Sequence, residues 1–264
     1  MKRQITRISS PACAPRLLPG GLTRKYFLLA ILLPALLWYG AIHSRSYLIQ
    51  PRCLATSTAG PPPCMKEELP LVDQFLVGHE SGLADGYSFF TQNLSGALAV
   101  VIPTSWNVAL FLTGRLSPVG GLLVTLGTDL GLVLQTVAWN GVFTELSHTL
   151  SQRPRPFVYS DPMTRGIDPA HYTSFYSGHT SFAAATQVVT LLILLARGAP
   201  YWLIILQGIL CEVLIFSTAY FRMLAGRHFY TDVMCGAIGG TLAAVLVIAF
   251  YQRISAQKNG SSLA

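Results

Sequence analysis

The strongest constraint on this chain is a series of six long apolar runs. They cover residues 26–42, 94–114, 118–146, 180–197, 201–221 and 233–251. A helix needs about 20 apolar residues to cross a bilayer, and it satisfies its own backbone hydrogen bonds inside the apolar layer. We therefore predict an all-α fold, a polytopic membrane protein built as a bundle of six transmembrane helices.

The low content of charged residues supports this class of protein. Only 11% of the 264 residues are charged, whereas soluble domains contain about 25%. This composition excludes a disordered chain, a coiled coil and most soluble enzymes. In a membrane protein, a net charge of +7 reflects residues that set the topology or meet lipid phosphate. We therefore expect membrane lipids, and no nucleic acid, as partners.

The apolar runs divide the chain into three parts. Residues 1–25 form a basic N-terminal tail without acidic residues, residues 26–252 form the membrane domain, and residues 253–264 form a C-terminal tail. A secretory signal peptide is the alternative for the first run. We favour a retained helix, because the basic segment is unusually long and no A-x-A cleavage site follows it. We expect a Pro-rich loop over 43–68 and a short interfacial helix plus loop over 69–93.

The distribution of lysine and arginine predicts how the bundle is oriented. Placing both tails in the cytoplasm keeps most of the flanking positive charge inside. The loops 147–178 and 222–232 then face the extracytoplasmic side, although they contain five arginines: Arg153, Arg155, Arg165, Arg222 and Arg227. Because a guanidinium grips phosphate oxygens bidentately, these loops indicate an anion-binding site. We expect a bacterial inner membrane as the location, because the short loops carry no eukaryotic targeting tail.

The five cysteines do not form a metal-binding pattern. They show no CxxC pair and no histidine at ligand spacing, so we expect no metal site. Cys53 and Cys64 share a loop on the predicted outer side, where disulfides persist. They form either a disulfide or two unpaired thiols. Cys211 and Cys235 lie in apolar runs, where we expect them to pack as small hydrophobic residues.

Three polar segments, 148–156, 175–180 and 221–232, meet at the same membrane face in a six-helix topology. His228 and Asp232 are four residues apart, so on a helix the carboxylate can hold the tautomer of the imidazole. An imidazole held in this way is a competent nucleophile. The third segment therefore predicts a catalytic histidine with an acidic partner.

The other two segments supply groups that suit a phosphate. Ser177 and Gly178 open a helix, whose free backbone N–H groups bind phosphate. His179 then stands where it can protonate a leaving alkoxide. Arg155 and Arg222 are expected to neutralise the equatorial oxygens of the transferred group.

These three segments resemble the signature of the type 2 phosphatidic acid phosphatase (PAP2) superfamily, whose fold is shared with vanadium haloperoxidases. That signature reads K-x6-R-P, then P-S-G-H, then S-R-x5-H-x3-D. The matching positions are Arg155, Pro156, Ser177, Gly178, His179, Arg222, His228 and Asp232. The resemblance covers about residues 90–250. It implies a six-helix membrane enzyme that hydrolyses phosphate esters through a phosphohistidine on His228, without metal or another cofactor.

The sequence departs from this signature at three positions. His148 stands in place of the lysine, Tyr176 in place of the proline, and Phe221 in place of the serine. In the family the lysine contacts phosphate. We therefore expect either His148 or Arg153 to take that contact.

Other polar residues in and near the apolar runs are given ordinary structural roles. Asp129 and Glu212 lie within runs, where we expect packing or a buried hydrogen bond. Glu145 lies one turn before His148 and is placed to orient it. We interpret the remaining histidines and loop arginines as satisfied or solvated polar groups, namely His43, His79, His171, Arg165 and Arg227.

The function that fits best is a lipid phosphatase acting on a phosphorylated or pyrophosphorylated lipid. A phosphotransferase, in which a second lipid replaces water, uses the same chemistry and is not distinguished by sequence. A vanadate-dependent oxidase is disfavoured because that group is soluble. A catalytically inactive transporter or scaffold is disfavoured by the intact His179, His228 and Asp232. The oligomeric state is left open.

Overall fold

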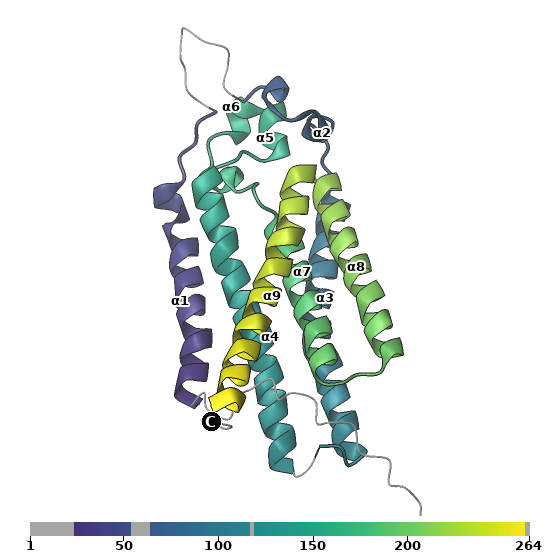
Figure 1. The fold of residues 1–264 in the computed structure, drawn as a ribbon. Coiled ribbons are helices and arrows are strands. Elements are labelled where there is room, and N and C mark those ends of the chain that lie inside the picture. The colour runs from purple at the N-terminus through teal and green to yellow at the C-terminus, as the bar shows by residue number, and fades with distance from the viewer. Residues whose placement is uncertain (1–23, 54–63, 117–118, 262–264) are drawn as a thin grey trace, which may run out of the picture.

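The computed structural model describes residues 24–53, 64–116 and 119–261, and most of them lie in long helices (Figure 1). Most of the predicted basic tail and part of the Pro-rich loop lie outside the described residues. Six helices in the described part are long and apolar enough to cross a membrane, and no strand occurs in it. The six are α1 (Arg24–Leu48), α3 (Gly82–Leu112), α4 (Val119–Ser151), α7 (Gly178–Ala196), α8 (Tyr201–Leu224) and α9 (Tyr230–Ser261). The predicted all-α six-helix bundle is confirmed.

Short elements gather at one end of this bundle and form a cap (Figure 1). They are η1 (Lys66–Glu68), α2 (Leu71–Gln74), α5 (Pro156–Ser160), α6 (Pro162–Arg165) and η2 (Pro169–Tyr172). The beginning of α1 and the end of α9 lie at the opposite end of the bundle. This is the arrangement that six successive crossings produce.

Helix α7 is the centre of the bundle, because it packs against α3, α4, α8 and α9. Its buried residues Val189 and Ile193 belong to the main apolar core, together with Leu132 and Tyr251. Helix α9 lies very close to α7 at Gly240, where an added Cβ would stand 2.0 Å from the backbone oxygen of Ser181. Glycine at this position therefore allows the two backbones to touch.

Helix α3 begins at Gly82, twelve residues before the apolar run that predicted it. The expected helix plus loop over 69–93 is therefore only partly right, since α2 is short but residues 82–93 belong to α3. Ser81 caps the helix by accepting a hydrogen bond from the Ala84 N–H. The polar side chain of Ser88 faces inward and is fully buried. In this helix, polar residues such as Ser88 lie on the face toward the protein interior, and they do not mark the end of the helix.

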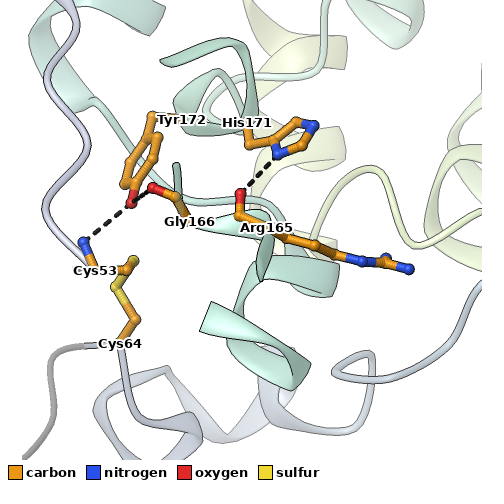
Figure 2. The surroundings of a disulfide bond; sticks show 6 residues. All are labelled: Cys53, Cys64, Arg165, Gly166, His171 and Tyr172. Atoms are coloured by element: carbon orange, nitrogen blue, oxygen red, sulfur yellow. Dashed lines mark hydrogen bonds between the residues drawn. A yellow bond between two sulfur atoms is a disulfide. The ribbon is translucent and has the colours of Figure 1, made fainter. Parts of the chain in front are cut away.

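Cys53 and Cys64 form a disulfide that closes the loop leading from α1 into the cap (Figure 2). The Cys53 N–H donates to the Tyr172 hydroxyl at 3.0 Å, and that hydroxyl donates to the Gly166 carbonyl at 2.8 Å. The loop is thereby fixed to η2 and to the end of α6. Cys211 is buried, as predicted, and is not bridged.

Candidate active site

A cavity of about 360 Å³ lies at the cap end of the bundle, among α1, α3, α4 and α7. Its wall carries six basic side chains, which come from α1 and from the three polar segments: Arg45, His148, Arg155, His179, Arg222 and His228. Five of these, all except Arg45, were predicted as members of one site from the three polar segments. The structure therefore brings the predicted segments together around one cavity.

His228 stands in this wall with a defined tautomer. Its Nδ1 lies 2.7 Å from the Ser174 carbonyl oxygen, and because a carbonyl only accepts, Nδ1 carries the proton. Nε2 is therefore left with its lone pair, and it has no hydrogen-bond partner in the described part of the chain. Burial, and then the charges of Arg222 and Arg155, lower the pKa of His228 well below its ordinary value. The imidazole is thus neutral at physiological pH.

Asp232 does not hold His228 in the way that we predicted. Its Oδ2 is 3.9 Å from Nδ1 of His228, too far for a hydrogen bond. Instead it accepts a hydrogen bond from the Ser174 hydroxyl at 2.5 Å, and Ser174 holds the imidazole through its carbonyl. The reason is local, because α9 begins only at Tyr230. His228 therefore precedes the helix, and helical spacing does not apply to the pair.

Arg153 does not reach the cavity, so the prediction that it replaces the missing lysine is wrong. Its two terminal nitrogens donate to Asp73 at 2.8 Å and to Asp232 at 2.6 Å. Its guanidinium also lies over the Phe229 ring, 4.4 Å from the centroid. Asp73 was not predicted, and it is fully buried. It also accepts hydrogen bonds from the backbone and hydroxyl of Thr231.

Arg155 and Arg222 line the cavity, and both leave buried donors unpaired. Arg155 donates to the Thr173 hydroxyl at 3.0 Å and has no carboxylate partner among the residues described. Arg222 pairs with Asp85 at 2.7 Å. The Nε of each arginine is buried without a hydrogen-bond partner. Because an unpaired buried donor is costly, these atoms favour an anion in the cavity.

The start of α7 provides the remaining predicted groups. Ser177 is buried and caps the helix, accepting a hydrogen bond from the Thr180 N–H at 3.4 Å. Gly178 and His179 lie in the cavity wall, and Ser177 does not. The His179 ring packs edge-on against Phe89, and its Nε2 is buried without a partner. His179 is therefore held by packing, with a ring nitrogen available to a ligand.

Residues 129–256 match the model of the PAP2 superfamily. This part of the chain belongs to the PAP2 superfamily. The match covers α4 from Asp129 onward, α7, α8 and most of α9, and it leaves α1, α2 and α3 outside. No curated protein and no solved structure matches the chain. Membership in the superfamily supports a phosphatase-type enzyme.

The PAP2 signature is altered at His148, and the structure shows what surrounds that histidine. Its Nε2 donates to the Tyr176 carbonyl at 3.1 Å. Its Nδ1 lies 3.3 Å from Nη2 of Arg45 and 3.7 Å from a carboxylate oxygen of Glu145. Both ring nitrogens are engaged, so His148 offers no free donor to a phosphate. Arg45, which was not predicted, supplies the positive charge at this side of the cavity.

Four polar residues outside the cavity, His43, His171, Arg165 and Arg227, are satisfied or partly solvated, as we predicted. Nδ1 of His43 and of His171 lies within hydrogen-bond distance of a backbone carbonyl. Arg165 and Arg227 have side chains that are 38% and 39% exposed. Within the described ranges, no group of three or more His, Cys, Asp or Glu residues is arranged to hold a metal ion.

Proposed function

We propose that this protein is an integral-membrane lipid phosphatase. It hydrolyses a phosphate or pyrophosphate monoester of a lipid through a phosphohistidine intermediate, without a metal ion. The observation that carries the proposal is the state of His228, with Nδ1 bonded to the Ser174 carbonyl and Nε2 unpaired. This nucleophile shares a cavity with two arginines whose Nε atoms have no partner.

The proposed reaction has two steps at phosphorus. In the first, Nε2 of His228 attacks, the bond to the leaving oxygen breaks, and His179 donates a proton to that oxygen. In the second, His179 takes a proton from water, which displaces the histidine and releases phosphate. Arg155, Arg222 and the N–H groups at the start of α7 stabilise the charge on the equatorial oxygens.

The lipid nature of the substrate is supported by the apolar part of the cavity wall. Apolar side chains from three helices line it, namely Trp38, Ile42, Val137 and Phe182. A phosphate held at the arginines can place its attached apolar chain along these residues and within the membrane layer. On the charge pattern of the flanking segments, we place both termini in the cytoplasm and the cavity on the outer side of a bacterial inner membrane.

The test is phosphate release by protein purified in detergent. We expect turnover of a diacylglycerol phosphate and of a prenyl diphosphate, and the rates should be unchanged when a chelator is added. His228→Ala should lower kcat by at least about 10³-fold. His43→Ala is the matched control, because His43 is exposed on α1 and bonds only the Tyr39 carbonyl. Full activity of His228→Ala, or loss of activity with chelator, contradicts the proposal.

Two further measurements separate the roles of the histidines and of water. With nitrophenyl phosphate, whose leaving group needs no proton, His179→Ala should still form phosphoenzyme, whereas His228→Ala should form none. Adding an acceptor lipid should leave phosphate release unchanged. Transfer of the phosphoryl group to that lipid in place of release identifies a phosphotransferase instead.

A further inference from the structure

We propose that Arg45 on α1 is a third phosphate-binding arginine of this active site. The inference rests on the proposed function and extends it to a helix that the superfamily match does not include. Arg45 would contact the substrate phosphate through Nη1, its one nitrogen that has no hydrogen-bond partner in the described structure.

Helix α1 is held against the side of the cavity by a close contact. An added Cβ at Gly141 would stand 2.3 Å from the indole ring of Trp38, so glycine at this position lets α1 lie directly on α4. Trp38, Ile42 and Arg45 follow at spacings of four and three residues, which places them on one face of a helix. All three line the cavity. Arg45 is the charged end of this face.

The side chain of Arg45 is fixed on one edge and unengaged at the other. Its Nε and Nη2 donate to the two carboxylate oxygens of Glu145 in a bidentate pair, and Nη2 also lies beside Nδ1 of His148. Glu145 is only 4% exposed, whereas the Arg45 side chain is 33% exposed. The buried carboxylate therefore aims a guanidinium whose remaining nitrogen is accessible.

The charges of the cavity wall favour an anion at this position. The wall contains three arginines, Arg45, Arg155 and Arg222, and a single carboxylate, Glu145. Arg45 lies near enough to Arg155 for their like charges to interact. A phosphate dianion between them relieves this repulsion and accepts charge-assisted hydrogen bonds from both. Glu145 holds Arg45 in place until the phosphate arrives.

Inorganic phosphate is the probe, used as a competitive inhibitor of nitrophenyl phosphate hydrolysis by the full-length protein in detergent. Arg45→Met keeps a long side chain but removes the charge, and it should raise the Ki of phosphate about 10- to 100-fold. Arg45→Lys should recover part of that loss. Arg165→Ala is the control, because Arg165 is also paired with a carboxylate, Glu80, but lies outside the cavity. Its Ki should equal that of the parent.

A second variant distinguishes phosphate binding by Arg45 from a purely structural role, in which the Arg45–Glu145 ion pair acts only as a clamp that holds α1 against α4. Glu145→Gln removes the competing negative charge, while the amide oxygen can still accept a hydrogen bond from Arg45 and keep it in position. Phosphate should therefore bind several-fold more tightly. A clamp predicts the opposite, because losing either partner then loosens α1 and weakens phosphate binding. The inference is overturned if Glu145→Gln weakens phosphate binding, or if Arg45→Met changes Ki less than twofold. A parent protein that neither binds phosphate nor hydrolyses the ester overturns the proposed function as well.

Discussion

Partly or fully buried arginines lie at both ends of this helical bundle, and the two ends differ in how the charge is balanced. At the end far from the cap, Nη2 of Arg197 donates to Asp129 at 2.6 Å, and Nε lies 3.2 Å from both of its carboxylate oxygens. Asp129 accepts a further hydrogen bond from Asn107 at 2.7 Å. This arginine has a complete partner within the protein.

At the cap end, the arginines do not each have a carboxylate of their own. Arg155 has one hydroxyl, that of Thr173, and no carboxylate among the described residues. The carboxylate of Asp85 is divided between Arg222 and Arg227. Since burying an unpaired charge is costly, a protein retains it where a ligand supplies the counter-charge. The balance of charge therefore separates a structural ion pair from a binding site.

The largest effect is expected from removing the ion pair between Arg197 and Asp129. Arg197→Met leaves Asp129 as an unpaired buried carboxylate, which should lower the free energy of unfolding by about 3–5 kcal/mol. Denaturant unfolding in detergent measures this loss. The Ki of inorganic phosphate should be unchanged, because the cavity lies at the other end of α7. In the double variant Arg197→Met with Asp129→Leu, most of the stability should return, and a persistent loss argues against an ion-pair effect.

At the cap end, we expect little change in stability and a large loss of activity. Arg155→Met removes a charge that has no carboxylate partner, so the free energy of unfolding of the empty protein should be unchanged or higher. The kcat/KM for nitrophenyl phosphate should fall about 10²- to 10³-fold, because one donor to the transferred group is lost. Destabilisation of Arg155→Met to the same degree as Arg197→Met removes the distinction between the two ends.

A smaller effect is expected from the carboxylates that hold the cap end together. Asp73→Asn weakens the support of Arg153, which in turn holds Asp232 and the loop of His228. We expect kcat to fall about 10-fold, the value of one hydrogen bond to a charged group, with the Ki of phosphate unchanged. Asp168→Asn is the control, since Asp168 is an exposed cap residue that bonds the Ala170 N–H. A rise in Ki without a fall in kcat contradicts a positioning role for Asp73.

The contrast between the ends also shows what the sequence could and could not predict. Apolar length predicted six crossing helices, because that property depends on neighbouring residues. The beginning of α3 was missed because inward polar residues such as Ser88 look like the end of an apolar run. Asp129 was correctly expected in a buried hydrogen bond, yet its ion pair was not foreseen. Its partner Arg197 is 68 residues away, at the C-terminal end of α7.

The residues of the candidate site also fall into those that the sequence predicted and those that it missed. His148, His179, His228, Arg155 and Arg222 were predicted because motif spacing reports residues that lie in the same segment, and all five line the cavity. The residues that were missed act across long separations: Arg45 is 100 residues from Glu145, and Asp73 is 80 residues from Arg153. Such pairs are created by the packing of helices and cap elements, and no local pattern records them.

The smallest expected effect concerns pH, and it links the unpaired charge to the nucleophile. In the proposed mechanism His228 attacks only when neutral, so kcat/KM should decline on the acidic side as this imidazole takes up a proton. Burial lowers its pKa most, and the positive charges of Arg222 and Arg155 lower it further. The acidic decline of the parent should therefore lie below the ordinary imidazole value of 6.5.

Removing one of those charges moves the decline in a defined direction. In Arg155→Met the protonated imidazole is repelled less, so the pKa of His228 rises and the acidic decline shifts to higher pH. Arg197→Met is the matched control, because its charge lies at the far end of the bundle and is already cancelled by Asp129. Both variants use the same nitrophenyl phosphate, so ionisation of the substrate is common to their profiles. A shift to lower pH in Arg155→Met, or an equal shift in both variants, means that the unpaired arginine does not act on His228.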